Sequence, residues 1–422
     1  MNRKIDTHEL RKGMYVCELD RPWVGTPFLF QGFEIRSDDE IETLRSLCQY
    51  VYITDIPPRT ATPRPRTAAP APPSAADPAT ATHANLLSAA LRNPTAPPRY
   101  HDLVTLEEEV AAAREIESNT RELIYSIMDD VRLGHSLDAM RAKKAVGGMV
   151  ESVVRNPDAL VWLTQLKNRD AYTALHSLRV CILALTFGRH LDLSTEELNL
   201  LGTGALLHDI GKLRISPEIL NKPARLTDEE YAIMKSHVPI GVGILDDTRG
   251  IPAPAIAVAR FHHERYSGAG YINGITGDQI GLFGLIGAIV DAYDAITSDR
   301  AYHDGLSAYD ALKKLYDSRG KDFHPGLVEQ FIQCMGIYPI GSIVELNTGS
   351  VGVVITVNRD RRLRPKVVVV LDENKRPHPV APVLDLSHTG PDSGGTIIEI
   401  RQVLPAGAFK ISANSYLPLA KV

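Results

Sequence analysis

A proline-rich stretch divides this chain of 422 residues into separate folding parts. Residues 56–98 hold 11 of the 28 prolines and no glycine, together with many alanines and threonines. Such a segment cannot bury enough apolar surface to offset the entropy lost on ordering, and its prolines keep it extended. We therefore predict a disordered linker over residues 56–102, with an N-terminal domain before it and the larger part of the chain after it.

The first 55 residues predict a small α+β domain. The apolar stretches MYVCEL, FLFQGFEI and QYVYITDI are typical of strands. Between them, residues 38–48 place apolar side chains at the spacing of one helix face.

After the linker the hydrophobic period changes once. Residues 103–335 show helical spacing, and two capping-box patterns, at 194–197 and 227–230, mark helix starts. Residues 336–422 instead show short β-branched runs, namely SIVEL, GVVITV, KVVVVL and TIIEI. The predicted fold class is therefore multidomain, with an all-α domain between a small α+β domain and a C-terminal β-rich extension.

Two segments outside the centre of the helical domain have more than one interpretation. Residues 103–166 predict either a helical hairpin that packs on the next helices or a helix for homodimerisation or a signalling partner. The basic run at 359–366, RDRRLRPK, is typical of a solvated hairpin turn, with a nucleotide or partner site as the alternative.

Charge and cysteine content exclude several classes of protein. Lysine and arginine total 46 and aspartate and glutamate total 51, so a net charge of −5 argues against a general nucleic-acid binder. No apolar run reaches the length of about 18 residues that a membrane span needs, and the N-terminus lacks the apolar core of a signal peptide. The four cysteines lie far apart in apolar surroundings, so we expect reduced thiols and a cytoplasmic protein.

The histidines and aspartates of the helical region suggest a metal centre. The candidate ligands, single or in adjacent pairs, recur at intervals of 25 to 32 residues. That is about the length of one helix and one loop, so each of several packed helices can contribute one ligand position. The candidates are His176, His208, Asp209, His237, His262, His263 and Asp291.

Asp209 and Asp291 decide between a metal centre and ordinary core histidines. Both lie in apolar sequence, GALLHDIGK and GLIGAIVDAYDAI, where a lone carboxylate is costly to bury. A divalent cation removes that cost, and so does a buried arginine or lysine. Imidazole and carboxylate together suit iron, manganese, nickel or zinc. Seven ligands are too many for one tetrahedral ion, so two divalent transition-metal ions are expected.

Other residues near these positions can contact a substrate. Lys212 follows Asp209 by three residues and can either interact with a helix C-terminus or contact a phosphate. Gly268 and Gly270, in HHERYSGAGYI, allow close backbone approach to a ligand. Arg300 follows Asp291 by nine residues, and its guanidinium suits either phosphate oxygens or a surface ion pair.

The ordered set of motifs HDIGK, MKSHVPIG, HHERYSGAGY and DAYDAITSDRAYH resembles the HD-GYP branch of the HD phosphohydrolases, from about Tyr172 to Leu327. The N-terminal CELDRPW and TPFLFQGF resemble the domain of unknown function that often precedes it. The resemblance implies an all-helical phosphodiesterase with a binuclear or trinuclear metal centre. Its substrate would be cyclic di-GMP, which is hydrolysed through pGpG to GMP.

By position, the resemblance implies roles for individual residues. Asp209 would bridge the two metals, Lys212 would lie near the scissile phosphate, and Gly270, Tyr271 and Arg300 would contact substrate. The first metal would take His176, His208, Asp209 and Asp291, and the second would take Asp209, His237, His262 and His263.

Three departures from the family pattern stand out. The proline of glycine–tyrosine–proline is Ile272 here, and Ser267 replaces a frequent aspartate in the same loop. Loss of a rigid proline should loosen the loop without removing a ligand. Members with three metals carry a glutamate at the position of Tyr172, so we expect two metals.

The expected reaction is attack on phosphorus by a hydroxide that bridges the metals, with Asp209 and Lys212 as the catalytic residues. Two other functions stay open. One is a hydrolase acting mainly on pGpG or another nucleotide. The other is a catalytically weak cyclic di-GMP receptor that signals through partners.

Overall fold

The computed structural model describes residues 2–21, 26, 28, 30, 32–54, 87, 91, 98–165, 172–298, 305–359, 361–388 and 397–416, and only the backbone of residues 2, 172, 173 and 414. It divides into two compact units, Met1–Ala76 and Asp77–Val422. Nearly all of the predicted linker lies outside the described residues. The predicted domain boundaries at 55, 102 and 335 therefore stay predictions.

The described part of the N-terminal unit is an antiparallel sheet with one α-helix and a short 3-10 helix (Thr7–Glu9), in agreement with the predicted α+β domain. The sheet order is β1-β4-β2-β3, and helix α1 (Asp38–Leu47) begins with a capping box formed by Ser37 and Glu40. Ile41 and Leu44 of α1 are buried in the core of this unit. The strands are β1 (Asn2–Asp6), β2 (Tyr15–Leu19), β3 (Phe33–Glu34) and β4 (Tyr50–Thr54).

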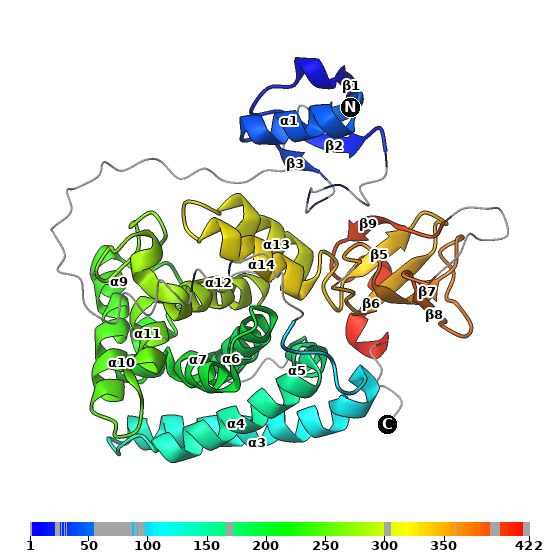
Figure 1. Ribbon diagram of the computed structural model, residues 1–422. Helices are drawn as coiled ribbons and strands as arrows, with labels where there is room; N and C mark the ends of the chain where they lie inside the picture. Colours follow the sequence, from blue (N-terminus) through cyan, green and yellow to red (C-terminus); the bar gives the residue numbers. More distant parts are fainter. Residues whose placement is uncertain are drawn as a thin grey trace. The chain divides into compact units, whose positions relative to one another are not determined.

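The second unit begins with a bundle of helices (Figure 1). Its helices are α3 (Leu106–Arg132), α4 (Ala139–Arg155), α5 (Pro157–Thr164), α6 (Tyr172–His190), α7 (Thr195–Leu207), η2 (Ile210–Arg214), α8 (Pro217–Leu220), α9 (Asp228–Lys235), α10 (His237–Asp246), α11 (Ala253–Phe261), α12 (Gly281–Thr297), α13 (Ala308–Asp317) and α14 (Pro325–Met335). Both predicted capping boxes are present, at the starts of α7 and α9.

Helices α6, α7, α11 and α12 form the centre of the bundle, where α7 packs on both α6 and α11. Close backbone contact fixes the neighbouring segments. A Cβ atom on Gly211 of η2 would lie 2.0 Å from the carbonyl oxygen of His237, so only glycine lets η2 approach α10 this closely. The two metal-ligand candidates beside this contact, Asp209 and His237, are thereby brought together.

Helices α3 and α4 form the predicted helical hairpin along one side of the bundle (Figure 1). Its polar anchor is Glu109, which is buried in α3. The Glu109 carboxylate accepts hydrogen bonds from Arg155 at 2.7 and 2.8 Å and from the Ser152 hydroxyl at 2.8 Å. Because a buried ion pair is lost only at a substantial cost, α3 is held firmly against α4.

The C-terminal extension is a five-stranded antiparallel sheet of order β8-β7-β6-β5-β9. Three predicted strands are confirmed, whereas the prediction for TIIEI is wrong in position. That strand begins only at Ile400, because Ile400–Leu404 are the residues that pair with β5. The strands are β5 (Ile343–Leu346), β6 (Val351–Thr356), β7 (Lys366–Leu371), β8 (Val383–Asp385) and β9 (Ile400–Leu404).

The basic run at 359–366 connects β6 to β7, but it is not a simple solvated turn. Arg359 pairs with Asp158 of α5 at 2.5 Å, and the Asp158 side chain is only 5% exposed. Arg361 and Arg364 donate to the carbonyl oxygens of Ser387 and Ile398. The run therefore ties the sheet to the helices and closes its own loops.

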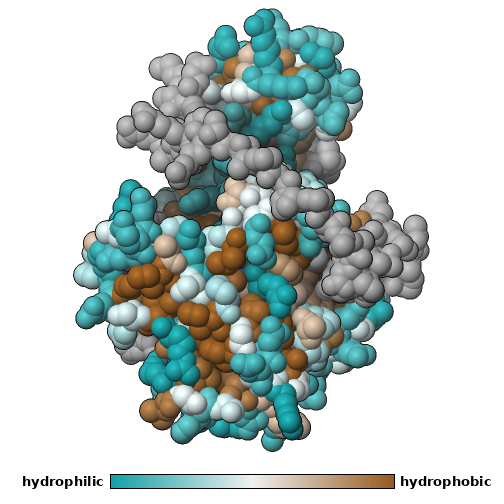
Figure 2. Space-filling model, turned by 90° about the vertical axis from the view of Figure 1, so that its left-hand side faces the viewer, coloured by the Kyte–Doolittle hydropathy of each residue, from teal (hydrophilic) through white to brown (hydrophobic). Residues whose placement is uncertain are grey.

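Among the residues that the structure describes, the segment Gly277–Thr297 is long and apolar enough to cross a membrane. The sequence predicts no span there, because Asp278, Asp291 and Asp294 interrupt the apolar run. Of its most apolar window, 78% is buried inside the protein. This burial, and the packing of α12 against α6 and α11, are those of a core helix. Figure 2 shows that hydrophobic residues also gather on one outer face of the helical bundle, mixed with hydrophilic ones.

Candidate metal centre

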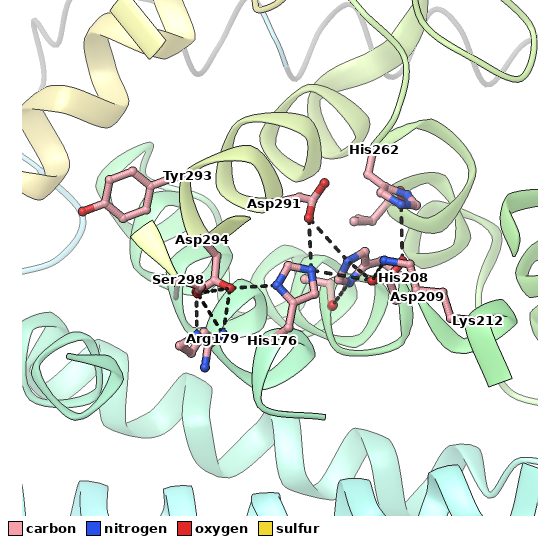
Figure 3. A network of polar contacts seen from close by, with 12 residues as sticks. His176, Arg179, His208, Asp209, Lys212, His262, Asp291, Tyr293, Asp294 and Ser298 are labelled. Atoms are coloured by element: carbon pink, nitrogen blue, oxygen red, sulfur yellow. Dashed lines mark hydrogen bonds and ion pairs between the residues drawn. The ribbon is translucent and has the colours of Figure 1, made fainter. Parts of the chain in front are cut away.

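Six helical elements bring the predicted ligands to one place. His176 lies within α6, His208 caps the end of α7, Asp209 starts η2, His237 starts α10, His262 and His263 follow α11, and Asp291 lies within α12. Figure 3 shows the labelled ligand side chains pointing toward one another. His176, His208, Asp209, His237 and His262 are all at least 97% buried.

The carboxylate of Asp209 lies between two groups of imidazoles. Its Oδ2 atom is 3.4 Å from Nε2 of His208 and 3.6 Å from Nε2 of His176. Its Oδ1 atom is 3.4 Å from Nε2 of His237 and 3.7 Å from Nε2 of His262. Ligand atoms of His176, His208 and Asp209 lie within 4.8 Å of one another, and so do those of Asp209, His237, His262 and His263. One carboxylate thus belongs to two groups of ligands.

Asp291 completes the first group. Its Oδ1 atom is 3.1 Å from Nε2 of His176 and 3.9 Å from Nε2 of His208. The first group then holds two imidazoles and two carboxylates, whereas the second holds three imidazoles and one carboxylate.

Backbone carbonyls fix which imidazole nitrogen faces the centre. Nδ1 of His208 donates to the carbonyl oxygen of Ala205 at 2.8 Å, and Nδ1 of His237 donates to that of Met234 at 2.7 Å. Nδ1 of His262 lies 3.0 Å from the carbonyl oxygen of Ala259. A carbonyl can only accept, so Nδ1 carries the hydrogen and the Nε2 lone pair points inward, as metal ligation requires.

His176 is oriented differently, by a carboxylate that the sequence analysis missed. Its Nδ1 atom lies 2.7 Å from Oδ2 of Asp294. Arg179 donates to both oxygens of Asp294, at 2.6 and 3.0 Å, and also to the hydroxyl of Ser298 (Figure 3). Asp294 follows Asp291 by three residues, and Arg179 follows His176 by three, so each pair shares a helix face. This spacing of three residues from a predicted ligand is the feature of the sequence that could have indicated Asp294 and Arg179.

The electrostatics favour a cation at this place. Burial would raise the pKa of Asp209, but the ammonium of Lys212 and the adjacent imidazoles hold it well below its usual range. Burial lowers the pKa of His237 to about 4, which leaves a neutral imidazole with a free lone pair. Burial would also lower the pKa of His176, but hydrogen bonds to Asp291 and Asp294 raise it to about 9, which marks a basic ligand.

Two buried polar atoms in the centre lack a hydrogen-bond partner among the described residues, Nε2 of His208 and Oδ1 of Asp209. Orphaned buried polar atoms are rare and require an explanation such as a bound ion. Both belong to predicted metal ligands, and both lie within the groups of side chains that could hold an ion. The residues present therefore fit divalent transition metals.

A cavity of about 760 Å³ opens over the centre. His176, Asp209, His237, His263 and Asp291 all line it. Its volume lies in the range of small-molecule sites, about 300–1,000 Å³. The centre is therefore accessible to a ligand of nucleotide size.

Three family models match successive parts of the chain. They are a domain of unknown function (DUF3391) at residues 2–142, an HD domain at 157–327 and a KOW domain associated with HD domains at 343–390. A Pseudomonas aeruginosa protein named cyclic di-GMP phosphodiesterase PA4108 is 33% identical over 391 residues, which cover 92% of this chain and 90% of that protein. The chain belongs to the HD-GYP family of cyclic di-GMP phosphodiesterases.

Two further relatives match a shorter part of this HD-GYP protein. The cyclic di-GMP phosphodiesterase response regulator RpfG of Xanthomonas campestris is 34% identical over 45% of this chain and 51% of its own length. The 3'3'-cGAMP-specific phosphodiesterase 2 of Vibrio cholerae is 35% identical over 39% of this chain and 32% of its own length. This chain therefore spans about half of the first relative and a third of the second.

The HD-GYP loop that bears Tyr271 lies against the centre. The Tyr271 ring stacks on His263, with ring centres 4.6 Å apart. Gly270 lets the backbone of this loop pass close to the backbone of Glu264, since a Cβ at position 270 would lie only 2.5 Å from Cα of Glu264. Glu264, another residue that the sequence analysis missed, accepts hydrogen bonds from the amides of Asn273 and Gly274 at 2.7 and 3.2 Å. These contacts hold the loop although Ile272 replaces the family's proline.

The remaining predicted residues of this HD-GYP site have different outcomes. The ammonium of Lys212 lies 2.5 Å from Oδ2 of Asp209, so in this structure it neutralises a ligand. Arg300 and the side chain of Tyr172 lie outside the described residues. Their predicted roles, in substrate binding and in limiting the centre to two metals, stay predictions.

Proposed function

We propose that this chain is a metal-dependent phosphodiesterase that hydrolyses cyclic di-GMP through pGpG to GMP. The observation that carries the proposal is the carboxylate of Asp209, whose two oxygens face two different groups of imidazoles beneath an open cavity. Family membership and the names of the relatives support the reaction class and the substrate. A cytoplasmic location is part of the proposal, in keeping with four free cysteines.

We assign two metals, since the ligands fall into two groups. The first metal would be held by His176, His208, Asp209 and Asp291, and the second by Asp209, His237, His262 and His263. Nitrogen and carboxylate ligands favour iron, manganese, nickel or zinc. When bound, such a pair supplies a nucleophile by lowering the pKa of water, and it offsets the charge of the phosphate.

The protein's own residues orient and stabilise the reactants. Asp209 and Asp291 are ionised, so they bind cations without first losing a proton. Lys212 lies on the cavity wall beside Asp209, where its ammonium can stabilise the charge that develops on the departing ribose oxygen. Tyr271 covers His263 and limits the access of bulk water to that ligand. Gly270 and Arg300 are assigned to substrate contact, because they match substrate-contacting positions in the family's motifs.

A catalytically weak receptor is the less favoured alternative. Such a receptor would need the cavity but not a full ligand set, and here all seven predicted ligands line up in two groups. A hydrolase acting mainly on pGpG would use the same residues, so only kinetics separates it from the proposed enzyme.

The test is a time course of cyclic di-GMP hydrolysis by the full chain loaded with manganese, iron or zinc. We expect pGpG to appear first and GMP to follow. The variant Asp209→Ala, with the ligand shared by both groups removed, should give no product. Binding of cyclic di-GMP without turnover by any metal-loaded form would contradict the proposal and favour the receptor.

A further inference from the structure

The last two turns of α3 form one wall of the cavity over the metal centre. Four residues of α3 line it, at spacings of three and four that share one helix face, namely Tyr125, Met128, Asp129 and Arg132. Helix α3 also packs against η2, which carries Lys212. The wall therefore lies next to the reactive centre.

This wall comes from outside the HD domain. Helix α3 lies within the match to the domain of unknown function at residues 2–142, whereas every predicted metal ligand lies within the HD match at 157–327. The Glu109–Arg155 pair and the α3–α4 contacts hold α3 in place, so the wall is a fixed part of the cavity. The cavity is thus complete only when both matched regions contribute.

Three of the described lining residues carry a permanent positive charge, and two of them are engaged near the centre. Lys212 pairs with the ligand Asp209. Arg265 donates to the carbonyl oxygens of His262 and Glu264 at 3.4 and 3.0 Å and stacks on Phe323. The third is Arg132, on the α3 wall.

Arg132 is the lining cation that can most easily change partner. Its guanidinium pairs with Asp129 at 2.6 Å, and the two side chains are 61% and 65% exposed. An exposed pair of this kind contributes little to stability, because water screens both charges. A guanidinium also matches phosphate oxygens in a bidentate geometry. Exchange of the Asp129 carboxylate for a phosphate therefore costs little.

Resting on the proposed function, we propose that Arg132 binds the second phosphate of a dinucleotide, the one that is not being cleaved. A dinucleotide that places one phosphate at the metals must place its other phosphate elsewhere in the cavity. The α3 wall offers a cation for that phosphate, and the side chains of Tyr125 and Met128 offer apolar surface for a purine. The N-terminal matched region thereby selects substrates with two phosphates.

The test compares two substrates on the full metal-loaded chain, cyclic di-GMP and bis(p-nitrophenyl) phosphate, which has a single phosphate. Arg132→Ala should raise the KM for cyclic di-GMP by about 10- to 100-fold, the range for one lost charge-assisted hydrogen bond, with a smaller change in kcat. The loss for bis(p-nitrophenyl) phosphate should be at least about tenfold smaller. Arg132→Lys should restore part of the affinity, since it keeps the charge but loses the fork.

Arg121→Ala is the matched control, because Arg121 lies on the same helix, pairs with Glu117 at 2.5 Å and does not line the cavity. It should leave the ratio of the two substrates unchanged. Equal losses on both substrates for Arg132→Ala, or an unchanged KM for cyclic di-GMP, would overturn the proposal.

The Kd of cyclic di-GMP, measured by calorimetry on the chelator-treated full chain, tests the role of Arg132 separately from the proposed phosphodiesterase activity. Metal-loaded wild-type protein that binds cyclic di-GMP without hydrolysing it would contradict the proposed function alone. The role of Arg132 would then be judged from the Kd, which should be about 10- to 100-fold higher for Arg132→Ala. Equal Kd values would overturn that role.

Discussion

Oδ2 of Asp294 lies 2.7 Å from Nδ1 of His176, and this contact sets the direction of the opposite ring nitrogen, Nε2. That nitrogen then faces Asp291 at 3.1 Å and Asp209 at 3.6 Å. Arg179 holds the other side of Asp294, so the carboxylate cannot rotate freely. The chain arginine–aspartate–histidine thus delivers one ligand in a fixed orientation.

Asp294→Asn should weaken metal binding by about 10- to 100-fold, the usual effect of losing a carboxylate that orients a histidine ligand. The amide keeps the shape but loses the charge that makes His176 basic. Metal titration followed by calorimetry measures the change. Asp246→Asn, which removes an exposed carboxylate paired with Arg260 at 3.4 Å, is the control. Equal metal affinity in both variants would show that Asp294 has no such role.

Metal content should depend on which ligand is removed. Wild-type protein is expected to bind two ions per chain. Asp209→Ala should bind neither ion tightly, since Asp209 alone belongs to both groups of ligands. His208→Ala should keep only the ion of the second group. Both variants should be inactive. Elemental analysis of the purified proteins checks the counts. Three fully occupied ions in the wild type would refute the two-metal assignment, and full metal with normal turnover in His208→Ala would refute the ligand set.

Lys212→Ala should lower kcat by about 100-fold, as the loss of an electrostatic stabiliser does, while metal content stays near two ions. An ammonium does not ligate a cation, and its removal leaves every ligand in place. Steady-state kinetics and elemental analysis on the same preparation separate the two effects. Unchanged kinetics would assign Lys212 only the neutralisation of Asp209 that the structure shows.

His190 should make the fold sensitive to acid. Burial, and then the nearby Arg359, lower its pKa from 6.5 to about 4 in the folded chain. Between these two values the unfolded chain binds more protons, so stability falls as the pH falls from 6.5 to 4, by up to roughly 3 kcal/mol. Below about pH 4 both states are protonated and this loss is complete.

Urea unfolding of chelator-treated protein at about pH 7 and about pH 4.5 measures the effect of His190. His190→Gln retains a polar partner for Gln330, which lies 3.1 Å from the imidazole, and should lose less stability on acidification than the wild type. An equal loss in the two proteins would place the acid sensitivity elsewhere.

The parts of this site that could be predicted from the sequence are those where burying a charged group would cost free energy. Asp209 and Asp291 interrupt apolar runs, and a charge in a core needs a compensating partner wherever the helices lie. The change of period near residue 336 likewise depends only on local pattern. These features do not depend on how the helices are arranged, so the fold class and a buried cluster of candidate ligands could be predicted.

Other features depend on packing that the sequence does not display. Asp294 and Arg179 read as ordinary helix residues until α6 and α12 lie side by side. The α3 wall needed the same information, since a helical period gives a face but not what that face covers. The strand at Ile400–Leu404 was misplaced because pairing with β5, rather than β-branched composition, sets its ends.

The carbonyl groups that orient His208, His237 and His262 come from the main chain, at Ala205, Met234 and Ala259. Every amino acid supplies that acceptor, so these three orientations tolerate sequence drift at the accepting positions. His176 differs, because its orientation depends on the side chain of Asp294. In an evolving or redesigned relative, the hydrogen bonds that orient these three ligands therefore do not depend on the side chains at the accepting positions, whereas residues 176 and 294 must change together.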